Sequence, residues 1–149
     1  MTFYRERLWP SPWMYLATAL VIPASLIVFL PINLVAGVVT AVVLYSACVV
    51  LMIVASPTIE VTDSVIAAGR ARLPIELAGG VSVHEGEDAT AERGTRLDAR
   101  AWLLIRGWVA PVVKIEVIDE QDPTPYWLVS ARRPRELEQA IAKAKAKLV

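Results

Sequence analysis

Residues 8–59 contain no Asp, Glu, Lys, Arg or His, and this stretch restricts the fold more than any other feature of the sequence. It is 52 residues long and consists mostly of Val, Leu, Ile and Ala. A helix needs about 20 apolar residues to cross a hydrocarbon core of about 30 Å, so the stretch is long enough to cross twice. We therefore predict a two-helix transmembrane hairpin over residues 13–57, with spans at 13–30 and 34–55.

Proline and asparagine mark the breaks inside the predicted hairpin. Pro23 lies in the middle of the first span and predicts a kink. Pro31 and Asn33 supply turn chemistry between the spans. A cleavable signal peptide is the rival interpretation of the first span, and we disfavour it because the apolar run is long and lacks a small-x-small cleavage site followed by polar residues.

Residues 1–12 have the composition of a membrane interface, with aromatic rings beside basic side chains. Arg5 and Arg7 precede the first span, Arg70 and Arg72 follow the second, and the connecting turn is uncharged. The positive-inside rule then predicts a multi-pass protein of the cell (cytoplasmic) membrane with both termini in the cytoplasm.

One face of the second span carries the small residues Gly37, Ala41 and Cys48 at helical spacing, and Tyr45 completes the row. Small side chains let two helices approach closely. We interpret this face as packing inside the hairpin, and the seam of a homodimer is the alternative.

Residues 58–149 hold most of the charges and predict a cytosolic α+β domain. Short runs with strand character predict seven strands, at residues 58–62, 65–68, 71–77, 81–85, 101–106, 112–118 and 126–130. Residues 86–100 read mainly as a loop with a short helical piece, and an apolar stripe predicts a helix at 134–148. Seven strands followed by one helix is the order of a pleckstrin-homology-like barrel, and a plain α+β roll is the alternative.

The charge balance of this domain excludes one class of partner. Its 13 basic and 14 acidic residues give no positive surplus. Since nucleic-acid binding depends on neutralising phosphates, we expect no nucleic-acid partner.

Catalytic, cofactor and metal sites are not expected in this sequence. His84 is the only histidine and is interpreted as an exposed residue at a strand end, while Cys48 lies inside a predicted span. The carboxylates that follow His84 match no calcium-loop spacing. A small membrane enzyme that uses Glu60 or Asp63 at the membrane surface is the remaining catalytic hypothesis.

Arginines form the best candidate binding surface. Arg70 and Arg72 lie one residue apart on a predicted strand near the membrane, so their side chains project to one side. Arg132, Arg133 and Arg135 add three more where the last strand meets the helix. Such a surface suits anionic headgroups or an acidic partner, and simple solvation is the alternative.

A resemblance to a known family rests on four sequence segments: residues 4–9 (YRERLW), 69–74 (GRARLP), 122–130 (DPTPYWLVS) and 132–134 (RRP). Together they resemble an actinobacterial two-span membrane-protein family known only as a domain of unknown function (type 3093). The resemblance covers nearly the whole chain and implies a host lineage and an architecture, with no activity. The polar part is similar to bacterial pleckstrin-homology-like domains in strand order.

The sequence thus predicts a non-catalytic, membrane-tethered adaptor or binding module for a protein partner or lipid headgroups. An auxiliary subunit of a larger membrane enzyme or transporter, held through the Gly37 and Ala41 face, is the alternative.

Overall fold

The computed structural model describes residues 1–148, which divide into two compact units. Residues 9–56 form one unit, which we call the helical hairpin. Residues 1–8 and 57–148 form the other, which we call the sheet domain. The hairpin is therefore inserted into the sheet domain after its first strand.

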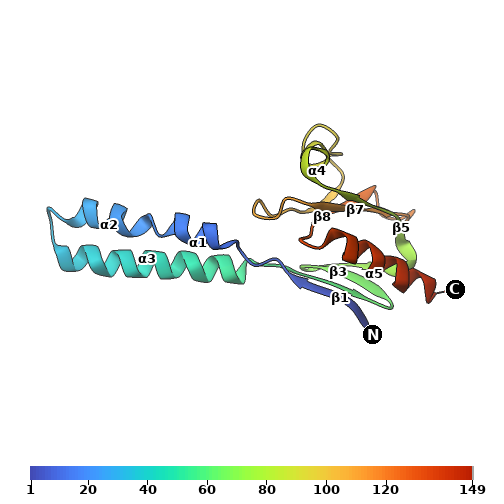
Figure 1. Ribbon diagram of the computed structural model, residues 1–149, viewed down its shortest axis with the longest axis horizontal. Helices are drawn as coiled ribbons and strands as arrows, with labels where there is room; N and C mark the ends of the chain where they lie inside the picture. The colour runs from blue at the N-terminus through green and yellow to red at the C-terminus, as the bar shows by residue number, and fades with distance from the viewer. Residues whose placement is uncertain (149) are drawn as a thin grey trace. The chain divides into compact units, whose positions relative to one another are not determined.

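Three helices build the hairpin: α1 (Pro12–Thr18), α2 (Val21–Phe29) and α3 (Leu34–Val54) (Figure 1). The stretches Pro12–Phe29 and Leu34–Val54 are each long and apolar enough to cross a membrane. The two apolar helices expected from the charge-free stretch are therefore present. By length and composition alone, a signal sequence or the core helix of a soluble protein would pass the same test.

Pro23 explains the break between α1 and α2. Proline has no amide hydrogen for the carbonyl four residues earlier, and its ring crowds that carbonyl. The carbonyl oxygen of Ala19 instead accepts a hydrogen bond from the amide of Ile22 at 3.0 Å. The predicted kink thus occurs as a break at residues 19–20, one turn before the proline.

Asn33 starts the return helix, as its turn chemistry suggests. Its side-chain oxygen accepts hydrogen bonds from the amides of Val35 at 2.8 Å and Ala36 at 3.3 Å. These amides lack partners within the first turn of α3, so the side chain caps the helix.

Two four-stranded sheets and α5 (Pro134–Ala146) build the sheet domain (Figure 1). Sheet A is antiparallel and has the order β1 (Thr2–Arg7), β2 (Thr58–Thr62), β3 (Val65–Ala68) and β4 (Ala71–Pro74). Sheet B has the order β5 (Ala78–His84), β7 (Val112–Val117), β8 (Tyr126–Ser130) and β6 (Trp102–Leu104). The β6–β8 pair is parallel, and the other pairs of sheet B are antiparallel.

The expected seven-strand barrel is corrected to eight strands in two open sheets among the described residues 1–148. The additional strand is β1, which lies in a segment for which the sequence pattern predicts no strand. The third predicted strand ends early in a 3-10 turn, η1 (Ile75–Leu77), and the predicted loop after His84 contains α4 (Gly86–Arg93). The α+β class and the C-terminal helix are as predicted.

α5 packs between the two sheets and fills the core (Figure 1). Its apolar stripe is fully or almost fully buried together with the inner residues of both sheets: Leu137, Ala140, Ile141 and Ala144 from the helix, Ile59, Val61 and Ile66 from sheet A, and Val113, Ile115 and Val129 from sheet B. Trp127 joins this core, with its ring centroid 4.4 Å from that of Trp102. Within residues 1–148, α5 is the helix that packs on sheet A, and it covers the inner face of the sheet.

The first and second strands of the chain are neighbours in sheet A. Arg7 is paired with Thr58, and the amide of Leu8 donates a hydrogen bond to the carbonyl oxygen of Pro57 at 2.9 Å. The chain therefore leaves sheet A and returns to it at adjacent positions, with the whole hairpin between them.

Candidate functional site

The outer face of sheet A carries a cross-strand row of Arg5, Glu60, Ala67 and Arg72. Residues two apart on a strand face the same side, so Arg7 projects to this face as well. The carboxylate of Glu60 accepts a hydrogen bond from the hydroxyl of Thr2 at 3.1 Å. Arginines therefore outnumber carboxylates on this face.

Arg70 lies in the turn between β3 and β4, so the prediction that it shares a strand with Arg72 is wrong, and Arg72 alone lies on β4. Gly69 precedes it with a φ of 61°, a left-handed conformation that glycine adopts without steric cost. The amide of Gly69 donates to the carbonyl oxygen of Thr58 at 2.8 Å. This bond holds the turn beside the point where the chain enters β2.

The structure separates four of the five predicted arginines into two groups, and the backbone amide of the fifth, Arg132, donates a hydrogen bond to Glu6. Arg70 and Arg72 are exposed, and within residues 1–148 neither has a carboxylate within ion-pair distance. Arg133 contacts Glu136 at 2.9 Å and lies 5.3 Å from the centre of the Tyr4 ring. Arg135 lies 3.6 Å from Glu85.

Glu6 connects β1 to the segment that follows β8. Its carboxylate is buried and accepts hydrogen bonds from the hydroxyl of Tyr4 at 2.7 Å and from the backbone amide of Arg132 at 3.2 Å. Burial, together with the bond to Glu6, raises the pKa of Tyr4 far above its ordinary value, so its hydroxyl remains a donor. The cluster joins β1 to the segment that precedes α5.

The outer face of sheet B carries a hydrogen-bonded chain through His84. The residue ends β5 as predicted, but its side chain is only 14 % exposed, so the predicted exposure is wrong. The Ser82 hydroxyl lies 2.9 Å from Nε2 of His84, and Nδ1 of His84 lies 2.5 Å from a carboxylate oxygen of Asp88. The bond to His84, followed by that to Arg96, lowers the pKa of Asp88 below its ordinary value. An ionised carboxylate only accepts hydrogen bonds, so Nδ1 of His84 donates to Asp88, and Nε2 is the ring nitrogen that faces the Ser82 hydroxyl.

Two sequence signals point to this chain in retrospect. Ser82 and His84 are two residues apart on one strand and therefore share a face. Asp88 follows four residues later in the first turn of α4. The order serine, histidine, aspartate is also the order of groups that activates a serine nucleophile.

A second network lies beside this chain and is centred on Glu92, which is 3 % exposed. Its carboxylate contacts Arg96 at 2.9 Å and Lys114 at 3.2 Å. Lys114 is the cross-strand neighbour of Ser82 and also lies 4.2 Å from the centre of the Tyr126 ring. The ammonium nearest in register to Ser82 is thus held by Glu92 and Tyr126, and both networks fix α4 on sheet B.

The other polar candidates lie apart from these networks. Asp63 is exposed in the turn between β2 and β3, and Glu60 lies on the outer face of sheet A. Within residues 1–148 no group of three or more His, Cys, Asp and Glu residues is arranged to hold a metal ion.

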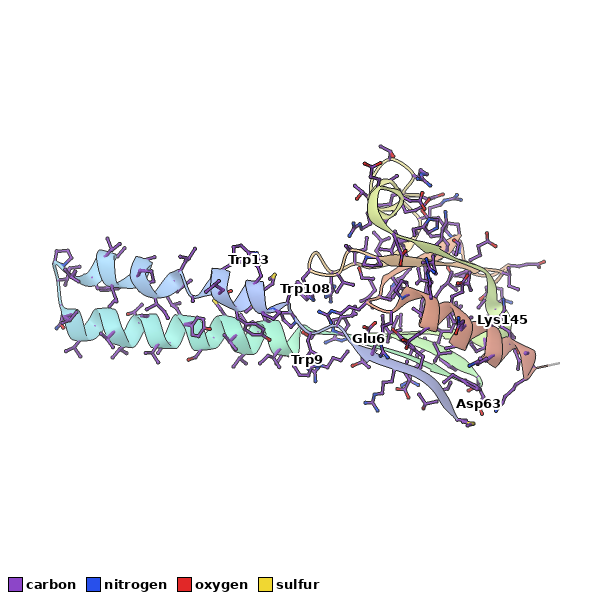
Figure 2. All side chains as sticks on the ribbon, viewed as in Figure 1. Glu6, Trp9, Trp13, Asp63, Trp108 and Lys145 are labelled. Carbon is purple, nitrogen blue, oxygen red and sulfur yellow. The ribbon has the colours of Figure 1, made fainter. Side chains whose placement is uncertain are left out.

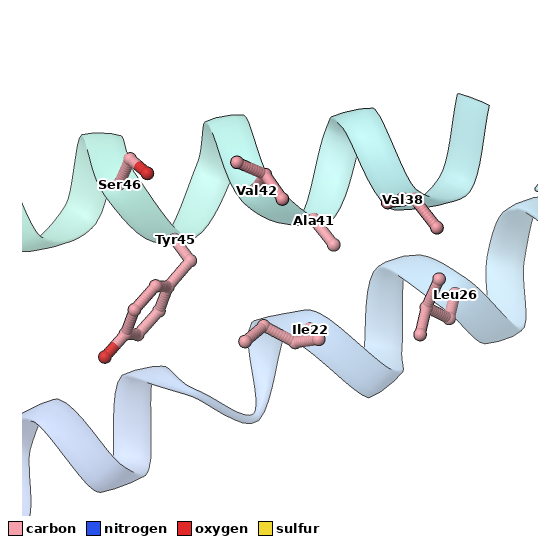
Figure 3. A pocket seen from close by; sticks show the side chains of 7 residues that line it. All are labelled: Ile22, Leu26, Val38, Ala41, Val42, Tyr45 and Ser46. Carbon is pink, nitrogen blue, oxygen red and sulfur yellow. The ribbon is translucent and has the colours of Figure 1, made fainter. Parts of the chain in front are cut away.

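The helical hairpin contains an apolar pocket of about 180 Å³ between α2 and α3 (Figure 3). Seven side chains line it: Ile22, Leu26, Val38, Ala41, Val42, Tyr45 and Ser46. Tyr45 and Cys48 are half-buried, whereas Gly37 and Ala41 are buried. A Cβ atom on Gly37 would lie 3.1 Å from that of Phe29, so this small residue lets α3 approach α2 closely.

Comparison with known proteins gives a family and no activity. Residues 3–141 match the family described as protein of unknown function (DUF3093). No curated protein and no solved structure matches the chain.

Proposed function

This chain belongs to the DUF3093 family, and we propose that it is an integral membrane protein whose sheet domain is a non-catalytic binding module at the cytoplasmic face of the cell membrane. The hairpin anchors the module, and the module binds a protein partner or lipid headgroups. The hairpin is surrounded by membrane lipid, and the proposed binding role requires neither a cofactor nor nucleic acid.

The pairing of β1 with β2 is the observation that carries this proposal. An apolar segment that leaves a folded sheet at Leu8 and returns at Pro57, where the two residues share a hydrogen bond of 2.9 Å, has both ends on one side of a membrane. That condition requires an even number of crossings. The two apolar helices supply two.

Exposure of the helices supports a lipid environment over the two other interpretations. Only 6 % of the stretch Pro12–Phe29 and 11 % of the most apolar part of Leu34–Val54 are buried, whereas the core helix of a soluble protein is mostly buried. Cleavage of the first helix as a signal sequence would remove β1, and with it the buried side chains of Tyr4 and Leu8. An uncleaved hairpin keeps the core of the sheet domain complete.

Charge supports the cytoplasmic orientation. Arg5 and Arg7 precede the hairpin and Arg70 and Arg72 follow it closely in sequence, while the turn at residues 31–33 is uncharged. Basic residues near the ends of spans favour the cytoplasmic side.

Membrane extraction combined with affinity purification tests this function. The full chain should stay in the membrane pellet after alkaline carbonate washing and dissolve only with detergent. Purification in mild detergent should then recover a reproducible protein partner or bound lipid. Recovery of intact protein in detergent-free buffer would contradict the membrane assignment, and a purified protein without any bound partner or lipid would contradict the binding role.

An auxiliary subunit of a membrane enzyme or transporter is the second candidate, favoured by the pocket beside Tyr45. Its expected contact through Gly37 and Ala41 competes with α2, since these residues pack inside the hairpin. Cross-linking from Cys48 distinguishes the two candidates. Capture of one foreign transmembrane helix favours the subunit, and capture of a second copy of this chain indicates a homodimer.

A further inference from the structure

We propose that one end of sheet A binds the phosphate groups of anionic lipids. We call this the arginine end, defined by Arg7 and Arg70, with Arg5 and Arg72 in the next outward-facing row. The inference rests on the proposed function, because it requires the hairpin to lie in the membrane.

The arginine end is the end of the sheet from which the apolar segment departs. Arg7 is paired with Thr58, and the turn holding Arg70 is bonded to Thr58 through the amide of Gly69 at 2.8 Å. Both arginines therefore lie beside the two chain connections, Leu8 and Pro57.

The connections themselves are short. Three residues, 9–11, separate Leu8 from the start of α1, and three others, 55–57, separate the end of α3 from β2. An extended chain advances at most about 3.5 Å per residue, so Leu8 lies within about 14 Å of the start of α1, and β2 begins within about 14 Å of the end of α3. The polar interface of a bilayer is about 5–8 Å thick on each side, and an arginine side chain reaches about as far.

Unpaired charge makes this end suited to an anion. Arg70 and Arg72 are exposed and have no ion-pair partner in the described residues, whereas Arg133 and Arg135 are paired with carboxylates. Glu60 is the carboxylate on this face, and Thr2 binds it. Guanidinium groups bind phosphate oxygens with two hydrogen bonds, so two free arginines offer a strong site.

An aromatic side chain lies at the same end. The indole nitrogen of Trp108 donates a hydrogen bond to the carbonyl oxygen of Leu8 at 3.3 Å, so the ring is held where the chain leaves the sheet (Figure 2). Tryptophan is enriched at the headgroup level of membranes.

The opposite ends of the strands carry acidic side chains. Asp63 lies in the turn between β2 and β3, away from Glu6 at the arginine end of β1 (Figure 2). The turn between β7 and β8 contains Asp119, Glu120 and Asp122. A negative membrane surface attracts the arginine end and repels these turns. The short connections to α1 and α3 keep the arginine end within reach of the headgroups, which favours lipid over an acidic protein as the occupant.

Lipid selectivity of the full chain in nanodiscs tests the inference. The nanodiscs contain equal amounts of phosphatidylcholine and phosphatidylglycerol, and native mass spectrometry counts the lipids that remain bound after release. Wild type should retain phosphatidylglycerol preferentially. The double variant Arg70→Gln/Arg72→Gln should lower this preference by about thirtyfold, because each arginine near an anionic surface raises affinity about fivefold.

The matched control is Lys143→Gln/Lys147→Gln, which removes the same charge from exposed positions on or next to α5. It should leave the preference within about twofold. Raising the salt from about 0.1 M to about 1 M, which shortens the Debye length from about 10 Å to about 3 Å, should weaken the wild-type preference without any substitution. Glycerol phosphate in solution should not displace the lipid, since it lacks the bilayer that holds the phosphate near the arginines.

Three results would overturn the inference alone, with the protein still membrane-integrated. These are equal retention of both lipids by wild type, equal effects of the two double variants, and release of a bound protein by the arginine variant with unchanged lipid retention. Failure of the chain to enter nanodiscs would instead contradict the proposed function itself.

Discussion

The carboxylate of Glu6 accepts a hydrogen bond from the backbone amide of Arg132 at 3.2 Å, across 126 positions of the chain. This contact joins the strand before the hairpin to the segment that enters the last helix. The residues before the hairpin are thus part of the folded sheet domain, and their loss would remove an edge strand together with the partner of Arg132.

Replacement of Glu6 by Ala should destabilise the sheet domain. It leaves the Tyr4 hydroxyl and the Arg132 amide without their acceptor in a buried place, which costs about 1–3 kcal/mol. Urea unfolding in detergent, followed by near-ultraviolet circular dichroism, measures the change. Glu120→Ala, at an exposed turn, is the control, and equal midpoints for the two variants would contradict the buried role of Glu6.

Acid should weaken the region around α4. The side-chain bond from Arg100 lowers the pKa of Asp98 to about 2, and the bond to His84 lowers that of Asp88 in the same direction. A carboxyl with a depressed pKa in the folded state stabilises the fold above its ordinary pKa of 3.8, and this contribution is lost as the pH falls through the folded value. The melting temperature should therefore fall between about pH 4 and about pH 2, and less steeply in Asp98→Asn. Identical slopes for the variant and wild type would contradict this assignment.

Ser82 provides the sharpest test of the non-catalytic proposal. Its bond to His84 resembles the arrangement of a serine hydrolase. The neighbouring cation, Lys114, is paired with Glu92 and is therefore not free to stabilise an oxyanion at Ser82. We expect a fluorophosphonate probe to leave the protein unlabelled at Ser82. Labelling that Ser82→Ala abolishes, and that Ser64→Ala leaves intact, would show an activated serine and contradict the proposal.

Gly37 distinguishes packing inside the hairpin from a dimer seam. Gly37→Leu should separate α3 from α2, because even a Cβ atom there lies 3.1 Å from that of Phe29. A disulfide between Leu26→Cys and Val38→Cys, which line the same pocket, reports this distance in a Cys48→Ser background. Gly37→Leu should slow its formation, while Val39→Leu, at an exposed position, should not. Unchanged disulfide formation in this background, together with loss of the dimer cross-linked from Cys48 when Gly37→Leu is placed in a chain that keeps Cys48, would favour the seam.

The hairpin is predictable from the sequence, whereas β1 is not. The inward-facing residues of β1 are Tyr4 and Glu6, and Leu8 follows directly after the strand. The charged side chain of Glu6 thus interrupts the apolar alternation that identifies a strand. The partner strand β2 also lies beyond the whole hairpin. Only the structure shows that Glu6 has buried partners.

Glycines and charged residues make the bounds of β5 and α4 difficult to predict. β5 extends from Ala78 through Gly79 and Gly80, where a register irregularity lets the Glu116 carboxylate accept a bond from the Gly80 amide at 3.1 Å. Two glycines in sequence suggest a strand end, so the predicted strand begins at residue 81. The short helical piece predicted within residues 86–100 is α4, but its bounds are not predictable because the polar sequence lacks an apolar stripe, and the helix is held by tertiary bonds such as that of Glu92 with Lys114.

Residue type alone identifies the arginines of the candidate site but does not predict which of them form ion pairs. The sequence favours Arg70 and Arg72 and adds the three arginines after β8 to the same candidate surface, whereas ion-pair geometry separates Arg70 and Arg72 from Arg133 and Arg135. Pairing across a fold depends on register and helix placement, which no local pattern contains.

Cysteine accessibility in intact cells tests the central claim most directly. In a Cys48→Ser background, Ser64→Cys reports on the turn between β2 and β3, and Ile32→Cys on the turn between α2 and α3. A membrane-impermeant maleimide added outside should label Ile32→Cys and should label Ser64→Cys only after the membrane is opened. Labelling of Ser64→Cys in intact cells, or equal labelling of both positions in a soluble fraction without detergent, would contradict a two-crossing hairpin that holds the sheet domain inside.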